Sequence, residues 1–459
     1  RASQWMEENI PLFECSQKNF EEMYYYRWWT LRKHIKETPV GYGMTEFLVN
    51  RSYADKYNLI ACAIGHHIYE SRWLRNPEYL NQIIHTWYRG NEGGPMAKMT
   101  KFSSWNADAV LGRYMVDGNK EFLLDMVKDL EAEYARWEKT NRLPNGLYWQ
   151  GDVQDGMEES ISGGRRKQYA RPTINSYMYG NAKALSLIGI MTGDEGMAMK
   201  YGLKADSIKT LVQDKLWNTD HHFFETMRGD ASAEVREAIG YIPWYFNLPD
   251  ASSKYTVAWK EVMDEKGFSA PYGLTTAERR HPEFRTHGVG KCEWDGAIWP
   301  FASAQTLTAM ANFMNNYPQT VLTDSVYFHH MERYVESQHH RGRPYIGEYL
   351  DEVTGYWLKG DQERSRYYNH STFNDLMITG LIGLRPRMDN TVEVNPLIPE
   401  GKWDYFCLDN VLYHGRNLTI LWDKDGSRYQ RGKGLHIYVD GKEVGHADTL
   451  TRVLCENVL

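Results

Sequence analysis

Amphipathic helical patterns follow one another from about residue 17 to residue 384, and this succession constrains the fold more than any other feature. In the clearest pattern, apolar side chains share one helical face: Leu123, Met126, Val127, Leu130, Tyr134 and Trp137. Asn119 is a suitable N-cap for this helix. Further helices are expected at about 173–191, 195–216, 301–314 and 323–338, with candidates near 17–37, 54–70, 76–88, 102–115, 251–264 and 371–383. The fold class is therefore mainly α.

The pattern changes after residue 384. Short strand-like runs at 391–394, 417–422 and 435–439 are separated by turn signals. The sequence predicts a helical unit of residues 1–384 and a small β-sandwich of residues 385–459. Paired helices with long loops favour an α/α toroid for the first unit. A solenoid is the alternative, since both stack helical hairpins, but no repeated sequence unit supports it.

Charge and apolar content exclude some classes of function. The net charge of −7 argues against nucleic acid as a partner, and no apolar run approaches the length of a membrane span. Sixteen Trp and 32 Tyr suit a sugar-binding protein, because these rings offer an apolar face with a polar tip. The alternative is that a large helical domain uses them for packing.

No metal site or cofactor is expected. The five cysteines form no CxxC pair, the paired histidines lack HExxH spacing, and neither a GxGxxG nor a phosphate loop is present. The chain starts at Arg1, and a processed export signal would leave the same start. The compartment is therefore left open, with a periplasmic or secreted location slightly favoured over the cytoplasm.

Two Gly-rich, aromatic loops, at 147–164 and 345–357, carry carboxylates. Hydrolysis of a sugar bond needs one carboxylic acid as proton donor and a second carboxylate to activate water. The donor must keep its proton near neutral pH, which apolar neighbours such as Met157 beside Glu158 favour. The alternative is that these acidic residues are solvated or cap helices.

A third loop, residues 292–300, places an aromatic pair around Asp295 just ahead of a helix. On a functional interpretation, Trp299 is a platform for a sugar ring and Asp295 accepts hydrogen bonds from hydroxyl groups. On a structural interpretation, both simply start the helix.

These loops, in this order, resemble the six-hairpin glycoside hydrolases of the trehalase, glucoamylase and glycoside hydrolase family 63 type, over about residues 27–384. The motifs are Leu143-Pro-Asn-Gly-Leu147 followed by Asp155-Gly-Met-Glu-Glu-Ser160, then Trp294-Asp-Gly-Ala-Ile-Trp299, then Glu348-Tyr-Leu-Asp-Glu-Val-Thr-Gly355. The resemblance is closest to the group similar to mannosylglycerate hydrolase.

The resemblance implies roles for two glutamates. Glu158 matches the family's general acid and Glu348 its general base. Asp155 is the rival proton donor, because it stands where the trehalase pattern has Ser. The substrate contacts implied or suggested by the loops are Asp55, Trp149, Asp155, Trp294, Asp295 and Trp299, with Arg27, Trp105 and Asn175 added. The family pattern has Trp at Ala54, Arg at Asp295 and Pro at Ala297, so the sugar is left open.

The resemblance thus implies an (α/α)6 toroid, a six-hairpin glycosidase with a small C-terminal β-sandwich. The implied activity is exo-acting hydrolysis with inversion, on α-linked glucosides or related α-glycosides, without metal or cofactor. Its partner is an oligosaccharide or glycoside. Inversion needs the two carboxyl groups roughly 6.5–9.5 Å apart. The alternatives are a polysaccharide lyase or sugar isomerase, since helical toroids host both, or a non-catalytic carbohydrate-binding protein.

Overall fold

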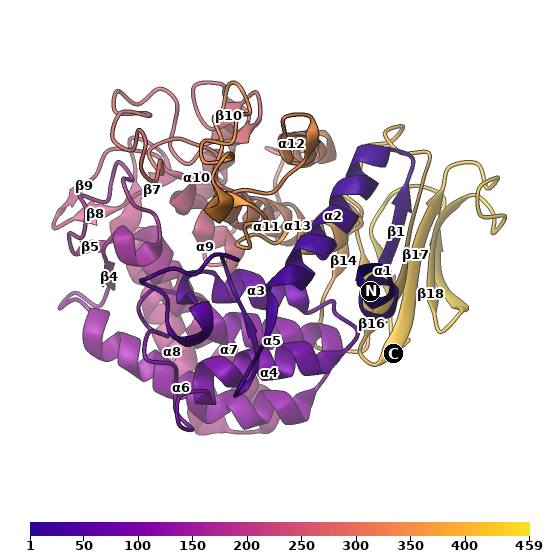
Figure 1. Cartoon of the computed structure of the whole chain (residues 1–459), viewed down its shortest axis with the longest axis horizontal. Coiled ribbons are helices and arrows are strands. Elements are labelled where there is room, and N and C mark those ends of the chain that lie inside the picture. The colour runs from indigo at the N-terminus through magenta and orange to yellow at the C-terminus, as the bar shows by residue number, and fades with distance from the viewer.

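The computed structural model describes the whole chain, residues 1–459, and helices dominate it up to Leu384 (Figure 1). Eight helices have twelve residues or more: α2 (Lys18–His34), α4 (Pro77–Arg89), α5 (Asn106–Asp117), α6 (Lys120–Asn141), α7 (Pro172–Thr192), α8 (Glu195–Leu211), α11 (Pro300–Asn316) and α12 (Asp324–Ser337). Shorter ones are α1 (Ala2–Asn9), α3 (Ile64–Ser71), α9 (Ile242–Tyr245), α10 (Ser253–Thr256) and α13 (Phe373–Leu376). The prediction of a mainly helical region is confirmed.

Local signals in the sequence set several of the helix ends. The Asn119 side chain accepts a hydrogen bond from the backbone N–H of Phe122 at 3.0 Å, so α6 begins as predicted. Helix α7 ends at Gly193, whose φ of 73° lies in the left-handed region that glycine adopts without strain. The observed α7 therefore exceeds its predicted range by one residue at each end.

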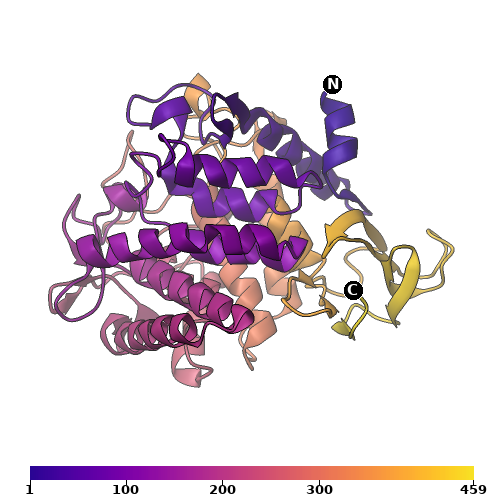
Figure 2. The same cartoon turned by 90° about the horizontal axis from the view of Figure 1, so that it is seen from below.

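Helix α7 is buried on nearly all sides and packs against α5, α6 and α8. One of its close approaches requires glycine, because a Cβ on Gly180 would lie 2.2 Å from the ring of Phe246. Figure 2 shows the purple and magenta helices of this region stacked side by side. The loops between these helices are long, and some of them carry the predicted chemistry.

Two predicted helices are wrong in part. Residues 54–70 become α-helical only at Ile64, because Tyr57 and Asn58 have φ values of 62° and 61° that no α-helix contains. Residues 251–264 form only the single turn α10 and a 3-10 stretch. There the ring of Trp259 stacks on that of Tyr241 with centroids 4.2 Å apart, so tertiary packing overrides helical propensity.

The strand-rich C-terminal region is confirmed, and it contains two antiparallel sheets. The larger has the order β1-β16-β17-β18-β19, where the last four are β16 (Tyr405–Tyr413), β17 (Arg416–Asp423), β18 (Gly434–Val439) and β19 (Lys442–Ala447). The smaller contains β14 (Leu384–Arg385), β15 (Val392–Val394) and β20 (Val453–Cys455). Strand β16 was not predicted, because a bulge at Asp409 and Asn410 interrupts its alternation.

The N-terminus supplies a strand to this C-terminal sheet. β1 (Leu12–Cys15) pairs antiparallel with β16, so that Leu12 lies opposite Asp409 and Cys15 opposite Phe406 (Figure 1). One large hydrophobic core runs through the helical region and the sheets. The two regions therefore pack as one body.

Short hairpins brace the loops between the helices. β4 (Trp149–Gln150), β5 (Tyr169–Ala170), β8 (Met227–Arg228) and β9 (Ala231–Ser232) form one small sheet. The two-stranded pairs are β2 (Ile35–Thr38) with β3 (Gly41–Met44), β6 (Trp217–Asn218) with β7 (Phe223–Phe224), β10 (Ser269–Ala270) with β11 (Gly273–Leu274), and β12 (His339–His340) with β13 (Arg343–Pro344). None of the helices combines the length and apolar character needed to cross a membrane.

Candidate active site

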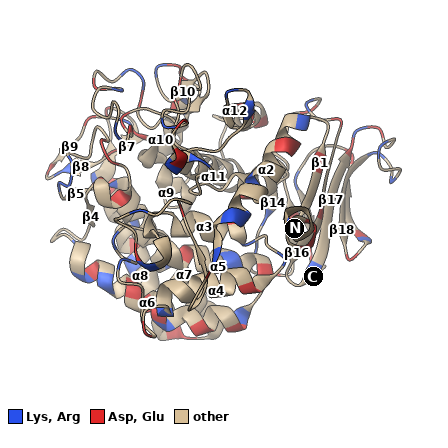
Figure 3. Ribbon diagram, viewed as in Figure 1, with Lys and Arg blue, Asp and Glu red and all other residues tan.

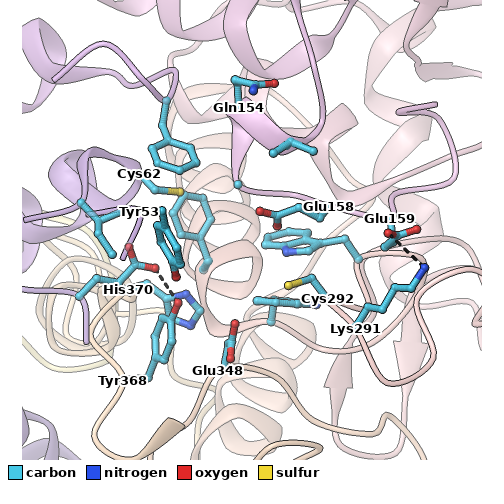
Figure 4. Close-up of a pocket in the computed structure, with 18 of the residues that line it drawn as sticks. Tyr53, Cys62, Gln154, Glu158, Glu159, Lys291, Cys292, Glu348, Tyr368 and His370 are labelled. Atoms are coloured by element: carbon cyan, nitrogen blue, oxygen red, sulfur yellow. Dashed lines mark hydrogen bonds and ion pairs between the residues drawn. The ribbon is translucent and has the colours of Figure 1, made fainter. Parts of the chain in front are cut away.

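One cavity of about 460 Å³ is lined by residues from all three loops singled out in the sequence (Figure 4). Its wall combines carboxylates, cations and aromatic rings from segments far apart in the chain. The acidic residues are Glu46, Glu158, Glu159 and Glu348; the basic ones are Lys101, Arg165, Arg166, Lys291, Lys359 and Arg364; the rings are Tyr53, Phe102, Trp294, Trp299, Phe301, Tyr368 and His370.

Glu158 stands on the long loop between β4 and β5, just after a tight turn. Gly156 makes the turn with a φ of 70°, and a Cβ there would lie 2.4 Å from the sulfur of Cys62. Burial raises the pKa of Glu158 to about 7, and the negative charge of Glu348 adds to the rise. A carboxyl group with this pKa keeps a proton on a large fraction of molecules at neutral pH, as a proton donor requires.

Glu348 reaches the same cavity from the loop that follows β13. Nη2 of Arg364 donates to both of its carboxylate oxygens, at 3.0 and 3.2 Å. The backbone N–H of Glu348 donates to the hydroxyl of Ser365 at 3.3 Å. Figure 4 shows Glu158 and Glu348 on different walls with their carboxyl groups directed into the cavity. A sugar can therefore lie between these two carboxyl groups, as hydrolysis by a pair of opposed carboxylates requires.

A third carboxyl group, that of Glu46, lies deep in the cavity wall. Its Oε1 accepts a hydrogen bond from the hydroxyl of Tyr368 at 2.7 Å, while Oε2 is buried without a hydrogen-bond partner. Burial raises the pKa of Glu46 to about 8; the Tyr368 hydrogen bond opposes the rise, and the charges of Glu348 and Glu158 add to it. At neutral pH this group is therefore mostly protonated, and one of its oxygens is free for a ligand hydroxyl.

Aromatic rings form the buried end of the cavity. Trp299 stacks between Trp294 and Tyr349, with ring centroids 4.5 and 4.4 Å away. Nε1 of Trp294 and Nε2 of His370 are buried without hydrogen-bond partners, and burial lowers the pKa of His370 well below its usual value. Aromatic faces and free polar atoms match the C–H faces and hydroxyl groups of a sugar.

A buried network behind the wall holds this end in place. Arg27 is fully buried and donates to Glu70 at 2.9 Å and to the side chain of Asn369 at 2.8 Å. Asn369 in turn stands between Tyr368 and His370, which both line the cavity. Trp105, like Arg27 a candidate substrate contact from the sequence, is also fully buried in this core.

Asp155, the rival proton donor, is buried beside the cavity but does not line it. Its Oδ2 accepts hydrogen bonds from Nε of Arg171 at 2.7 Å and from the hydroxyl of Thr173 at 2.5 Å, and its Oδ1 accepts one from Ser103. Both oxygens are thus occupied within the protein, and the side chain anchors the loop that carries Glu158.

Four further candidates lie outside the cavity wall. Asp55 and Asp295 accept hydrogen bonds from backbone N–H groups of nearby loops. Asn175 bonds to both the N–H and the carbonyl of Tyr148. Trp149 is half-buried on β4 and lies in a separate groove, described below. Among the predicted residues, Glu158, Glu348, Trp294 and Trp299 are brought together at the cavity.

The mouth of the cavity is rich in cations. Arg165 pairs with Glu159, and Lys291 lies 3.8 Å from the same carboxylate. Lys101, Arg166 and Lys359 line the cavity without an ion-pair partner. Elsewhere both signs of charge are interspersed along the outer helices (Figure 3). A ligand with a negative charge near the mouth therefore meets an excess of positive charge.

One group of side chains has the composition of a metal site. The ligand atoms of His221, Glu225 and Glu234 lie within 4.8 Å of one another, but none of these residues lines the cavity. Nδ1 of His221 is hydrogen-bonded to Glu225 at 2.6 Å, and Asn218 and Ser232 donate to the other oxygen of Glu225. The cluster thus lies outside the candidate active site.

Comparison with known families gives two matches along the chain. Residues 56–371 match the family described as "Mannosylglycerate hydrolase MGH1-like glycoside hydrolase domain". Residues 384–446 match the C-terminal domain of glycosyl hydrolase family 65. The first match contains Glu158 and Glu348, and the second covers most of the β-rich region.

Solved structures give a similar result. A protein described as "Sialidase" is 84% identical with a TM-score of 0.99, and the match covers 100% of this chain and 42% of that chain. This chain thus spans less than half of that protein. The GH63 mannosylglycerate hydrolase from Thermus thermophilus, solved with glucose, is 12% identical with a TM-score of 0.58 over 78% of this chain and 99% of that chain. A GH78 rhamnosidase from a Bacillus species is 13% identical with a TM-score of 0.63 over 94% of this chain and 42% of that chain.

Proposed function

Because the chain belongs to the family of MGH1-like glycoside hydrolases, we propose that it hydrolyses a glycosidic bond by a single displacement with inversion, using Glu158 as acid and Glu348 as base. The observation that carries the proposal is the position of these two carboxyl groups on different walls of one cavity. Inverting hydrolases need this arrangement, because the sugar and the attacking water must both fit between the two groups.

In the proposed reaction, Glu158 donates its proton to the glycosidic oxygen as the bond to the anomeric carbon breaks. Burial and the raised pKa of about 7 support this role, since the proton must be present before the leaving group departs. Glu348 removes a proton from the water that attacks the opposite face of the anomeric carbon. The products are the free sugar with inverted anomeric configuration and the leaving-group alcohol.

The pair between Arg364 and Glu348 supports the role of general base. Both carboxylate oxygens of Glu348 accept a hydrogen bond from one guanidinium nitrogen of Arg364, which fixes the orientation of the carboxylate. A base held in a fixed orientation can align the attacking water with the anomeric carbon. Arg364 is therefore a positioning residue in this mechanism.

The shape of the cavity supports exo action. Glu46, Trp294 and His370 line the cavity with buried side chains, while Tyr53, Arg166 and Lys291 line it with exposed ones, so the cavity has a buried part and a part open to solvent. A terminal sugar fits such a pocket, and the remainder of the substrate leaves through the mouth. The family resemblance favours α-linked glucosides or related α-glycosides as this terminal unit.

The cations at the mouth support a substrate with an acidic group on the leaving side. Lys101, Arg166 and Lys359 have no ion-pair partner there, so a carboxylate would find unpaired positive charge. Similar solved structures include a protein described as a sialidase and a mannosylglycerate hydrolase in complex with D-glycerate, and both descriptions refer to acidic compounds.

We also propose that the helices close into an (α/α)6 toroid of residues 1–384, with residues 385–459 as a β-sandwich appendage. The succession of long helices supports the first part, and the match of residues 384–446 to a C-terminal glycosidase domain supports the boundary. Strand β1 would then be the one element of the first unit that completes a sheet of the second.

The test is a panel of α- and β-linked disaccharides, acidic glycosides and aryl glycosides, with the anomer of the first product read by NMR. Release of a terminal sugar with inverted configuration is the expected result. A product with retained configuration would overturn the single displacement. An unsaturated product absorbing in the ultraviolet would indicate a lyase instead, and binding without any turnover would indicate a carbohydrate-binding protein.

A further inference from the structure

A second hollow continues from the mouth of the cavity. It is a groove of about 390 Å³, and Lys101, Gln154 and Arg166 line both the groove and the cavity. The last turns of α6 and the strand β4 form the rest of it, with Arg136 and Trp149 among its residues. Figure 4 shows Gln154 at the upper side of the cavity, and the same residue also lines the groove. A chain of sugars that leaves the cavity can therefore continue directly into the groove.

The groove is positively charged in a protein that is negative overall. Lys101, Arg136 and Arg166 line it, and no Asp or Glu does, although the whole chain has a net charge of −7. None of the three cations forms an ion pair with a carboxylate elsewhere in the structure, whereas Arg165 next in sequence pairs with Glu159. The three charges are thus available to a ligand.

The remaining lining suits a sugar. Trp149 is half-buried, and its strand is fixed by pairing with Ala170 and by a hydrogen bond from the Asn141 side chain to the Trp149 carbonyl at 3.0 Å. An aromatic ring presented from a fixed backbone can pack against the C–H face of a sugar ring. Amide side chains, including Gln154, line the groove beside it and can bond hydroxyl groups.

We propose that this groove binds the sugar units on the leaving-group side of the bond that is cut, and that these units carry carboxylate or sulfate groups. The proposal rests on the proposed function, since it takes the buried part of the cavity as the site of the terminal sugar. It makes the substrate an acidic oligosaccharide rather than a small glycoside. Trp149 packs against a sugar ring, while Arg136 and Arg166 bind its acidic groups.

The experiment compares two substrates of the enzyme. One is an aryl glycoside of the released sugar, which occupies only the cavity. The other is the anionic fraction of an oligosaccharide mixture from which the enzyme releases the same sugar. The neutral fraction of that mixture serves as the uncharged control substrate. The variants are Trp149→Ala and Arg136→Ala. Lys139→Ala is the matched control, because Lys139 is exposed on the same helix but does not line the groove.

The quantity measured is kcat/KM for the anionic oligosaccharides divided by kcat/KM for the aryl glycoside. Each groove variant is expected to lower this ratio about tenfold, the size of one well-packed contact, and Lys139→Ala is expected to leave it unchanged. Added NaCl is expected to raise KM for the anionic fraction more than for the aryl glycoside, because salt screens the cations. The proposal would be overturned if this ratio were the same in all variants, or if the enzyme cleaved the neutral and anionic fractions at equal rates.

Binding distinguishes failure of this inference from failure of the proposed function. If no glycoside is cleaved, the proposed function fails, and the groove is then tested by titrating the anionic fraction into the parent and the Trp149→Ala protein in a calorimeter. Weaker binding by the variant supports the groove without any catalysis, and equal binding rejects it.

Discussion

The negative charge of Glu348 raises the pKa of Glu158 across the cavity, although the two residues stand on separate loops. Glu348 has a cation within hydrogen-bond distance, since Arg364 Nη2 lies 3.0 Å from its carboxylate, whereas burial is the main influence on Glu158. Burial favours the protonated form of Glu158, as a proton donor requires, while the ion pair with Arg364 orients the carboxylate of Glu348.

Glu158→Gln removes the proposed proton donor and nearly preserves its shape. We expect kcat on substrates with poor leaving groups to fall by about 10²–10⁴-fold, the usual contribution of general acid catalysis. Aryl glycosides with acidic phenols need little protonation, so their rates should fall much less. Equal losses on both kinds of substrate would show that Glu158 does not act as the acid.

Asp155→Asn tests the rival donor. Because Asp155 pairs with Arg171 at 2.7 Å and both side chains are buried, the variant leaves a charged guanidinium without its partner. We expect a loss of stability on the order of 3–5 kcal/mol, seen as a lower midpoint of denaturant unfolding. A stable Asp155→Asn protein that loses activity only on poor leaving groups would make Asp155 the acid.

Glu348→Gln removes the proposed base. We expect kcat to fall by about 10²–10⁴-fold on every substrate, activated aryl glycosides included, because no group then accepts the proton of the attacking water. Sodium azide, which needs no deprotonation, should restore turnover and yield a glycosyl azide of inverted configuration. Undiminished hydrolysis, or an azide product of retained configuration, contradicts the assignment.

The pH profile should report the proton on Glu158. Since its pKa is raised to about 7, kcat/KM is expected to decline above pH 7, approaching a tenfold loss for each further pH unit as the acid deprotonates. Carbon NMR of the labelled Glu158 carboxyl should show its pKa falling in Glu348→Gln, which lacks the opposing charge. An unchanged pKa in that variant would mean that the two groups are not coupled.

Glu46 should make the protein less stable as pH rises. Its pKa of about 8 in the folded protein exceeds the ordinary value of 4.5, so the favourable contribution is complete below about pH 4.5 and is lost as pH rises toward 8. The loss is at most roughly 1.4 kcal/mol for each pH unit between those two values. Thermal unfolding at pH 5 and pH 8 should therefore show a smaller pH dependence in Glu46→Gln than in the parent protein. Identical dependence in both would place the titrating group elsewhere.

Much of the helical region could be predicted from sequence, because its signals are local. Asn119 and Gly193 set helix ends through their own side chain and backbone. The predictions failed where distant contacts decide the backbone, as at Trp259, or where residues such as Tyr57 adopt left-handed angles. Strand β16 was overlooked because a bulge hides its alternation.

In the candidate active site, too, residues with a local sequence signal could be predicted and residues placed by distant contacts could not. Glu158 and Glu348 stand in recognisable loop motifs, so a resemblance could suggest them, and both line the cavity. Glu46, Arg364 and His370 stand in no such motif, and their importance comes from folding that brings them beside those loops. The one local signal for Glu46 is a carboxylate among apolar neighbours, Met44 and Phe47. Arg27 and Asn175 were expected at the substrate and instead bond to the protein's own backbone and side chains.

The pairing of β1 with β16 has a consequence for how the chain reaches its final state. Leu12 and Asp409 can pair only after all the residues between them have been synthesised, so β16 pairs with a strand that was made long before it. Contacts this distant in sequence slow folding, because a very long loop must close before they form. Cutting the chain after residue 384 would separate β16 from β1, and an unpaired strand edge promotes aggregation.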